Sequence, residues 1–271
     1  MSIVTPILNG REFLDECIQS VLEQNYSKIE HIFVDGGSVD GSCEALAAYQ
    51  AKFATRIRII AAPGTGPGEA WNIGLKAARG EIFGSLGSDD VYEVGAIDTM
   101  VDFFRSTPEA CFLHGACDLI NEHGVIVGRH RVRPFNLKAF VNTAAHIATI
   151  SAFYKRIVME RVNWLDESGD DFDLMIRIAR EFRLYDIDVV LSKLRIHADS
   201  AFNPRDFTKR KAVYRQTYQV SRRYGGDLLS IIALKYYGAV LISLFHLEPL
   251  YPPLRSTFRR ALELRRAFDL R

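Results

Sequence analysis

Two short apolar runs that end abruptly in small polar residues constrain this chain more than any other feature. The first spans residues 2–10 and ends in Leu-Asn-Gly, and the second spans 32–41 and ends in Asp-Gly-Gly-Ser followed by Asp-Gly. Such runs are typical of strands that stop at a turn. Between them Phe13, Ile18 and Val21 recur at helical spacing, which predicts a strand, helix, strand unit. Because parallel strands end at one edge of a sheet, the two polar segments would line a common pocket.

The same alternation continues through the first third of the chain. We expect a helix over 43–53, a strand over 57–60, a helix over 69–78 and a strand over 82–86. The last of these strands runs into Gly-Ser-Asp-Asp at 87–90. Strand and helix pairs that end in a strand with paired acids are typical of the nucleotide-binding half of an α/β domain, and right-handed crossovers would bring all the strand ends to one edge.

The remainder of the chain changes character twice. Residues 110–133 predict short antiparallel strands with a turn at 122–124, and a helix-rich zone begins near residue 170. Residues 1–204 hold 20 Lys and Arg against 28 Asp and Glu, whereas residues 205–271 hold 14 against 5. We therefore predict an acidic α/β domain over 1–204 and a helical basic extension over 205–271.

The basic extension predicts helices over 207–224, 228–247 and 254–270. The middle one is the most apolar stretch of the chain, but Lys235 and His246 interrupt it, so we interpret it as a buried or interfacial helix. Paired arginines flanking apolar helices suit contact with an anionic membrane surface. Packing on the α/β domain or a homo-oligomer interface would use the same pattern.

Composition excludes several classes of protein. An apolar content of 48% and a charged content of 25% are those of an ordinary globular protein, not of a disordered or collagen-like chain. Four cysteines without CxxC spacing and an N-terminus without a signal-peptide pattern favour a cytoplasmic location. No recognition-helix or zinc pattern accompanies the basic residues, so we expect no nucleic-acid partner.

Carboxylates at the strand ends are the first candidates for chemistry. Asp89 and Asp90 follow an apolar strand directly and form a hard oxygen site of the kind that holds Mg²⁺ or Mn²⁺ against a diphosphate. The alternative is a solvated turn that caps a helix. Asp35 lies where a strand leaves the sheet and would accept hydrogen bonds from a base or a ribose, or would hold the Gly-Gly turn that follows.

A second acidic cluster and one histidine lie in the later part of the chain. Asp170, Asp171 and Asp173 precede an apolar helix, where acids commonly serve as caps. Three carboxylates in four positions repel one another, so one of them would have the raised pKa that a general base needs. His197 follows an apolar strand and is a candidate site residue, although a lone histidine is often only a packing residue.

Taken together, these motifs resemble the inverting glycosyltransferases of family 2, which have the GT-A fold, a nucleotide-binding sandwich with a mainly parallel central sheet. The similarity covers about residues 1–200 in order. It rests on Thr-Pro at 5–6 with Asn-Gly at 9–10, Phe-Leu-Asp-Glu-Cys-Ile-Gln-Ser-Val-Leu at 13–22, Asp-Gly-Gly-Ser at 35–38, Ala-Trp-Asn at 70–72, Ser-Asp-Asp at 88–90, Asp-Phe-Asp-Leu at 171–174 and Arg-Ile-His at 195–197.

The resemblance implies a role for each matching residue. The expected nucleotide-sugar-binding residues are Thr5, Pro6, Asn9, Asp35, Asn72, Ser88 and Asp89. The expected metal ligands are Asp89, Asp90 and His197, holding Mn²⁺ or Mg²⁺. Asp171 would be the catalytic base with Asp170 as its acidic neighbour, and Arg177 would buttress their helix. The implied donor is a nucleotide-diphosphate sugar, with a UDP-sugar favoured, and the implied acceptor is a glycan or a lipid-linked glycan.

The chain departs from the family pattern at several positions, and two of these departures concern the metal and the base. Gly87 stands where many relatives have Asp or Asn at the head of the metal motif, and Gly64-Thr65 stand where many have an acid that touches the base. Other classes also remain open. A nucleotidyltransferase that makes the sugar nucleotide would need a longer Gly-rich, basic loop than Asn9-Gly10-Arg11, and a silent binding module would not need intact acids. A dehydrogenase lacks its G-x-G-x-x-G motif after the first strand.

Overall fold

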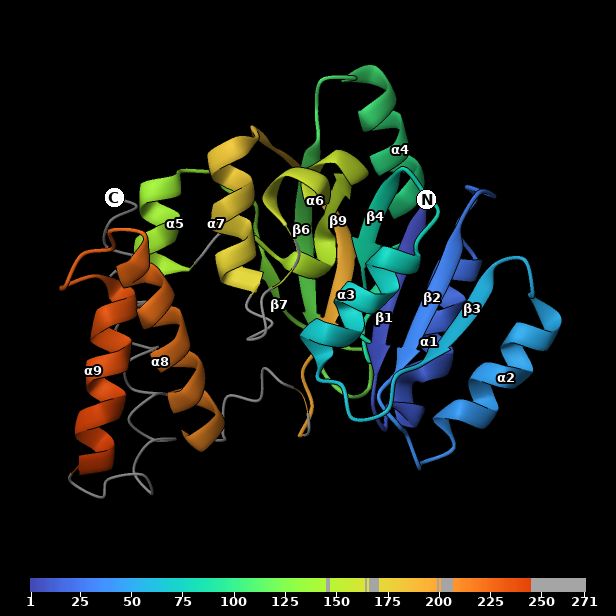
Figure 1. Ribbon diagram of the computed structural model, residues 1–271, viewed down its shortest axis with the longest axis horizontal. Coiled ribbons are helices and arrows are strands. Elements are labelled where there is room, and N and C mark those ends of the chain that lie inside the picture. Colours follow the sequence, from blue (N-terminus) through green and yellow to red (C-terminus); the bar gives the residue numbers. More distant parts are fainter. Residues whose placement is uncertain (145–146, 164, 166–170, 199, 201–206, 245–271) are drawn as a thin grey trace. The chain divides into compact units, whose positions relative to one another are not determined.

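The computed structural model describes residues 1–144, 147–163, 165, 171–198, 200 and 207–244 (Figure 1). The chain divides into two compact units. The first comprises Met1–Phe140 and Ala145–His197, and the second comprises Val141–Ala144 and Ala198–Arg271. The boundary predicted at residue 204 lies outside the described residues.

The first unit is built on one mixed sheet, in which the described residues form nine strands. The strands are β1 (Ser2–Ile7), β2 (Glu30–Asp35), β3 (Ile57–Ala61), β4 (Ile82–Ser85), β5 (Val91–Tyr92), β6 (Phe112–Ile120), β7 (Ile126–His130), β8 (Ala152–Lys155) and β9 (Leu184–Arg195). Their order is β3-β2-β1-β4-β8-β6-β9-β5, and β7 pairs with β6. The pairings give β1, β2, β3, β4, β6 and β9 one direction, and β5, β7 and β8 the opposite one.

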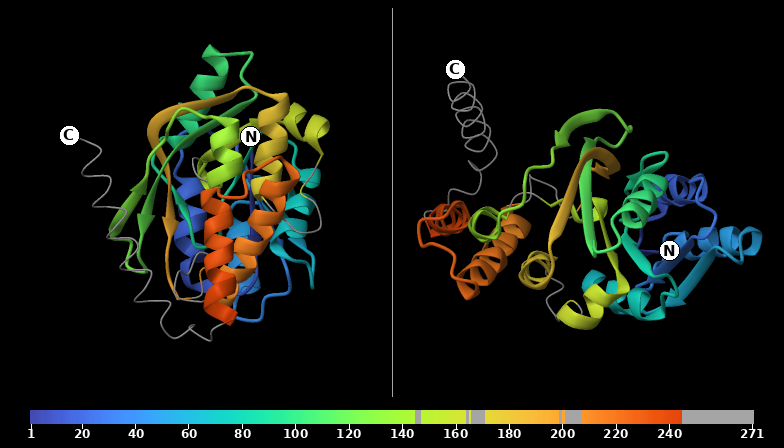
Figure 2. Two further views of the ribbon diagram at one scale, coloured as in Figure 1. Left: turned by 90° about the vertical axis from the view of Figure 1, so that its left-hand side faces the viewer. Right: turned by 90° about the horizontal axis from the view of Figure 1, so that it is seen from above.

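Helices connect and cover these strands. They are α1 (Arg11–Leu22), α2 (Ser42–Lys52), α3 (Pro67–Ala77), α4 (Ala96–Ser106), α5 (Leu137–Thr143), α6 (Arg156–Val162) and α7 (Asp171–Glu181), with a 3₁₀ turn at Thr149–Ser151. Within the first unit, α1 and α4 cover one face of the sheet and α3 and α6 cover the other (Figure 2). The mixed α/β architecture with a mostly parallel sheet confirms the predicted fold class.

Side chains that alternate along β1 fill the core on both faces. Ile3 packs with residues of α1 and α4 in one apolar cluster, and Ile7 packs with α1 and α2 in another. Val4 points the other way and is fully buried against Gly74 of α3. Two-residue alternation on β1 is therefore what allows helices to pack on both faces of the sheet.

Gly74 is required by this close packing of helix on sheet. A Cβ at position 74 would lie 2.4 Å from Val4 Cγ1 and 3.1 Å from Val34 Cγ2. Helix propensity favours alanine over glycine by about 1 kcal/mol, but overpacking a core costs about 1–3 kcal/mol. Because the clash with Val4 is short, we expect the overpacking cost to exceed the gain in propensity, so that Gly74→Ala lowers the free energy of unfolding by up to about 2 kcal/mol in urea denaturation.

Gly238 offers a control of identical chemistry, since a Cβ there would have no neighbour within 4 Å among the residues that the structure describes. Gly238→Ala should therefore stabilise its own helix by about 0.5–1 kcal/mol. Equal effects of the two substitutions would contradict this packing.

Strand register brings the polar segments predicted from the sequence to one edge of the sheet. Ile7 of β1 is paired with Asp35 of β2, and Val4 is paired with Ser85 of β4. These three strands are parallel, so the segments that follow them leave the sheet on the same side. The parallel strand β9 ends at this edge as well, because it pairs antiparallel with β5 directly after the acids of the 87–90 turn.

The second unit consists mainly of α8 (Phe207–Arg223) and α9 (Ile231–Leu244). The two helices are joined by aromatic contacts: the Tyr218 and Tyr236 rings stack at 4.8 Å, and the hydroxyls of Tyr218 and Tyr237 are 2.8 Å apart. Two of the three helices predicted for the extension are thereby confirmed, and the third, over 254–270, lies outside the described residues. Among the described residues, no helix has both the length and the apolar character needed to cross a bilayer.

Candidate functional site

Asp35 organises the turn after β2. The residue is buried, and its carboxylate accepts hydrogen bonds from the Gly37 N–H at 3.1 Å, from the Ser38 N–H at 3.2 Å and from the Cys43 thiol at 3.3 Å, as well as from the Ser38 hydroxyl. Burial alone would raise the pKa of Asp35, but these hydrogen bonds outweigh it and lower the pKa. The carboxylate therefore stays ionised and holds the Gly-Gly-Ser turn in place.

Asn9 joins the turn after β1 to the turn after β2. Its backbone lies in the left-handed region with φ 52°, which asparagine tolerates better than most residues. Its side-chain oxygen accepts a hydrogen bond from the Val39 N–H at 2.9 Å, and its own N–H donates to Ser38 Oγ at 2.9 Å. The two turns thus form one rigid wall at the edge of the sheet.

Thr5 and Pro6 lie on β1, directly before the turn that contains Asn9. Pro6 is half-buried, whereas Thr5 is fully buried and its hydroxyl oxygen lies 2.9 Å from Nε2 of the buried His31. The Thr5 side chain faces the interior, and its predicted part in nucleotide binding stays a prediction.

The Thr5 and His31 pair predicts a specific acid sensitivity. Desolvation, with a smaller repulsion from Arg56, lowers the pKa of His31 to about 3, whereas an unfolded histidine titrates near 6.5. Between those values only the unfolded state takes up the proton, so the free energy of unfolding falls as the pH drops through this window and is unaffected above it. The slope from one group is at most about 1.4 kcal/mol per pH unit.

We expect His31→Gln, which retains a donor for Thr5, to flatten the decline of stability between about pH 6.5 and pH 4 in urea denaturation. Identical pH slopes for the variant and the wild-type protein would contradict a neutral, buried His31.

The two acids after β4 face different surroundings. Asp90 is buried, and its Oδ1 accepts a hydrogen bond from the Arg195 N–H at 2.8 Å. Burial, reinforced by the neighbouring Asp89 charge, raises the pKa of Asp90. Asp89 is partly exposed, and its Oδ2 lies 2.9 Å from His197 Nε2. Asp89 and His197 are therefore the pair that a ligand can reach, and Asp90 fixes the turn behind them.

Glycine at position 87 is matched to this arrangement. A Cβ there would lie 2.5 Å from Asp90 Oδ2 and 2.8 Å from Asp89 Oδ1. Ser88 is half-buried in the same turn, next to Gly10. The departure from the family pattern at Gly87 thus makes room for the carboxylates of the two acids that follow.

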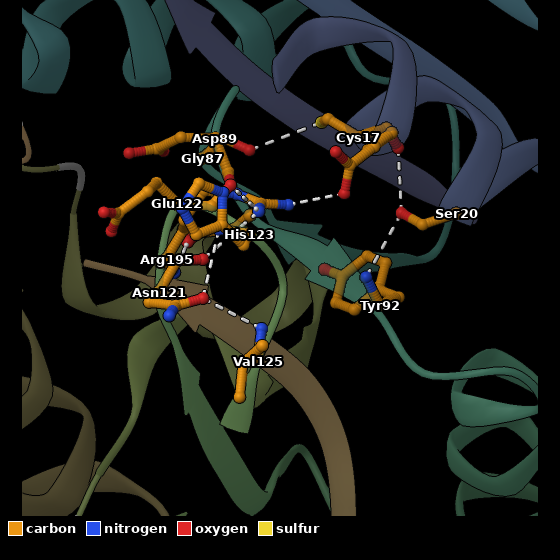
Figure 3. A network of polar contacts seen from close by, with 12 residues as sticks. Cys17, Ser20, Gly87, Asp89, Tyr92, Asn121, Glu122, His123, Val125 and Arg195 are labelled. Atoms are coloured by element: carbon orange, nitrogen blue, oxygen red, sulfur yellow. Dashed lines mark hydrogen bonds and ion pairs between the residues drawn. The ribbon is translucent and has the colours of Figure 1, made fainter. Parts of the chain in front are cut away.

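Arg195, the last residue of β9, was not predicted as a site residue, although it lies two positions before His197. Its side chain is 1% exposed, and its Nε donates to the Asp89 carbonyl at 2.9 Å (Figure 3). One of its terminal nitrogens donates to Glu16 Oε2 at 2.6 Å. The sequence signal for this role was an arginine at the end of an apolar strand, two positions before a candidate ligand.

Asn72 is engaged elsewhere in the first unit. Its side-chain nitrogen donates to the Leu165 carbonyl at 2.9 Å, and its side-chain oxygen accepts from the Leu165 N–H at 3.1 Å. The amide therefore fastens α3 to a backbone position six residues before Asp171. Its predicted contact with the nucleotide stays a prediction.

Asp171 is the first residue of α7 and is open to solvent, while Asp170 lies outside the described residues. Partial desolvation of the Asp171 carboxyl raises its pKa, although a hydrogen bond from the Thr149 side chain acts in the opposite direction. An accessible carboxylate with a raised pKa is what a general base requires.

Arg177, a residue of α7 itself, joins this helix to the C-terminal end of α6. Its Nε lies 2.8 Å from Asp173 Oδ2, and its NH1 group donates to the carbonyls of Val162 and, at 3.1 Å, Asn163. Asp173 is 4% exposed. Of the acids near 170, Asp173 is thus committed to a structural ion pair, which leaves Asp171 as the accessible carboxylate of the two that the structure describes.

Asp89 and His197 suit a hard divalent cation. A carboxylate oxygen and an imidazole nitrogen 2.9 Å apart present two of the donor types that Mn²⁺ accepts, and a diphosphate would supply further oxygens. Within the ranges that the structure describes, no three His, Cys, Asp or Glu side chains form a complete metal site. Asp89 and His197 by themselves therefore supply two donors that fit part of the ligand set of a divalent cation.

The fold and the position of this edge define a GT-A type glycosyltransferase domain. The family model for glycosyl transferase family 2 matches residues 2–162. The chain belongs to that family.

Curated relatives support the assignment. An uncharacterized glycosyltransferase of Rickettsia bellii is 26% identical over 218 residues, which cover 73% of this chain and 30% of the relative. Glycosyltransferase GlyG of Streptococcus pneumoniae is 36% identical over 101 residues, 37% of this chain and 33% of that protein. The chain thus spans about a third of the length of the first curated relatives that it matches.

Solved structures share the fold. The mannosyltransferase PcManGT from Pyrobaculum calidifontis, in complex with GDP-Man and Mn²⁺, has a TM-score of 0.65 at 18% identity, covering 97% of this chain and 79% of that one. Residues 1–349 of S. aureus TarS with UDP-GlcNAc have a TM-score of 0.59 at 15% identity, covering 88% and 71%.

Proposed function

We propose that this chain is an inverting glycosyltransferase that moves a sugar from a nucleoside-diphosphate sugar to a hydroxyl group of a glycan or lipid-linked glycan. The observation that carries the proposal is the meeting of three strand-end segments at one sheet edge, with Asp89 and His197 in contact there. Membership of glycosyl transferase family 2 supports the same reaction class. A nucleotidyltransferase has no corresponding support.

In this proposal Asp171 acts as the general base. The acceptor O–H transfers its proton to the Asp171 carboxylate as the oxygen attacks the anomeric carbon. The bond between that carbon and the diphosphate oxygen breaks on the opposite face, and the nucleoside diphosphate leaves. The raised pKa of Asp171 favours proton uptake at this point.

Asp89 and His197 would hold the divalent cation. Bound there, the ion would neutralise negative charge on the diphosphate. Asp90 would act from behind, since its hydrogen bond to the Arg195 N–H fixes the turn that presents Asp89. Mn²⁺ in the complex of PcManGT supports a divalent cofactor for this chain as well.

The nucleotide base would lie against the wall formed by Asn9 and the turn after Asp35. The Gly64 N–H donates to the Gly36 carbonyl at 3.0 Å, so the loop after β3 closes one side of this wall with backbone atoms. UDP and UDP-GlcNAc in complexes of TarS favour a uridine nucleotide, and GDP-Man in PcManGT is the competing precedent.

A thermal-shift comparison of UDP, GDP and dTDP, each with its sugars and with Mn²⁺ or Mg²⁺, tests the proposal. We expect one nucleotide series to raise the melting temperature, and to do so more with metal than without. The absence of a shift with every nucleotide would contradict the proposed function.

We further propose that the second unit contacts an anionic membrane surface near a lipid-linked acceptor. Residues 205–271 carry 14 Lys and Arg against 5 Asp and Glu, and the leucines at 229, 234 and 244 are 81%, 57% and 67% exposed. Binding of the whole chain to vesicles of anionic phospholipid, but not to neutral ones, is the expected result. Equal absence of binding to both would contradict it.

A further inference from the structure

The Arg195 side chain joins three separate parts of the first unit without reaching the surface. Besides its bonds to Glu16 of α1 and to the Asp89 carbonyl, its NH1 group lies 3.4 Å from the carbonyl oxygens of Asn121 and Glu122 in the turn between β6 and β7 (Figure 3). The guanidinium is therefore held by helix α1, by the turn of the acids and by a hairpin turn at once.

Arg195 is also linked to His197, the second candidate metal ligand, by way of the Phe13 ring. Its guanidinium carbon lies 4.4 Å from the centroid of the Phe13 ring, and that ring lies 5.1 Å from the His197 ring. Its backbone N–H bonds Asp90. Asp89, Asp90 and His197 are thus all connected to Arg195, each through a different contact.

Burying a guanidinium is unfavourable unless it is paired and hydrogen-bonded. Glu16 supplies the neutralising charge, and the carbonyl groups satisfy further N–H donors. The guanidinium of arginine is planar and donates hydrogen bonds in fixed directions, so it fixes the positions of the backbone carbonyls that it bonds. The flexible ammonium group of a lysine would not do so. This geometry suits the positioning of neighbouring groups.

We propose that Arg195, with Glu16 as its partner, is a positioning residue that holds Asp89 and His197 side by side for the divalent cation. The inference rests on the proposed function, because the cation is the one assigned to the sugar-nucleotide reaction. With only 1% of its surface exposed, Arg195 would act on Asp89 through the backbone and on His197 through Phe13.

Glu16→Gln is the sharpest test, because it keeps the size and one acceptor oxygen of the side chain and removes only its charge. Glu16 is 60% exposed, so this variant is expected to fold. Asp15→Asn is the matched control: it lies on the same helix and removes a carboxylate from an exposed pair with Arg11, whose side chains are 40% and 49% exposed. Arg195→Lys keeps the charge and removes the fork.

The measurement is calorimetric titration of UDP, with and without Mn²⁺. With Mn²⁺ present, we expect Glu16→Gln and Arg195→Lys to bind UDP about 10- to 100-fold more weakly than the wild-type protein does. Without metal, the two variants should bind UDP with the wild-type affinity. Asp15→Asn should match it in both buffers. A merely structural arginine would weaken binding equally with and without Mn²⁺, and that result would overturn the proposal.

Hydrogen exchange without any ligand gives a second readout. Faster exchange confined to residues 86–91 and 195–198 of the Glu16→Gln variant is expected. Unchanged exchange there, or uniformly faster exchange along the chain, would overturn the positioning role. Failure of the positioning role can be distinguished from failure of the proposed function. If the wild-type protein binds no UDP in either buffer, it is the proposed function that is contradicted.

Discussion

Asp171→Asn is expected to lower turnover by about 10²- to 10⁴-fold while leaving the affinity for the nucleotide nearly unchanged. The amide keeps the shape of the side chain but takes up no proton at neutral pH, so the acceptor hydroxyl would lose its base. Steady-state rates and calorimetry on the same preparation, with the donor found by thermal shift, measure both quantities. Turnover within threefold of the wild-type value would end the assignment.

Asp171→Asn is also expected to leave the stability of the protein unchanged or to raise it. The raised pKa of Asp171 means that the folded state disfavours the ionised form, so a neutral amide should leave the melting temperature equal or higher. Asp173→Asn is the contrasting control, because it breaks the ion pair of a buried carboxylate with Arg177. That variant should lower the melting temperature. A lower melting temperature for Asp171→Asn would indicate a structural role instead.

Asp89→Ala is expected to remove the effect of metal on donor binding. The substitution deletes the carboxylate next to His197 but keeps the backbone carbonyl that Arg195 bonds, so the turn should persist. With Mn²⁺ present, we expect nucleotide affinity to fall at least on the order of 10- to 100-fold, and without metal to equal that of the wild-type protein. Calorimetry in the two buffers measures the difference.

Asp102→Asn is a suitable control for this variant. Asp102 is an exposed acid of α4 whose ion pair with Arg105 spans 3.5 Å. Its removal should change binding in neither buffer. An Asp89→Ala variant that retains the full gain in affinity from Mn²⁺ would place the cation elsewhere.

The elements nearest the N-terminus could be predicted because their signals are local. The strands that end near Asn9, Asp35 and Asp89 each carry a short apolar run and a polar turn, and the helices between them have clear apolar spacing. Parallel pairing then requires these ends to share an edge. The wall of the candidate site therefore followed from the sequence.

The features of the candidate site that could not be predicted from the sequence depend on contacts between residues far apart along the chain. Asn72 bonds a residue 93 positions away, and Arg195 bonds Glu16 across 179 positions. Asp89 and Asp90 are adjacent and chemically alike, yet one faces solvent and the other the Arg195 backbone, since the strand end fixes their directions. Helix α4 was also not predicted. Pairing and direction of this kind are set by tertiary packing and not by local pattern.

Hydrogen exchange with and without UDP and Mn²⁺ tests most directly where the nucleotide binds. We expect protection of residues 7–10, 35–40, 87–91 and 195–198, the segments that meet at one edge of the sheet. Protection instead around the pocket of about 490 Å³ that Tyr26, Phe104 and Lys155 line, at the start of β4 and the end of β8, would contradict it. So would nucleotide binding that leaves all four segments unprotected.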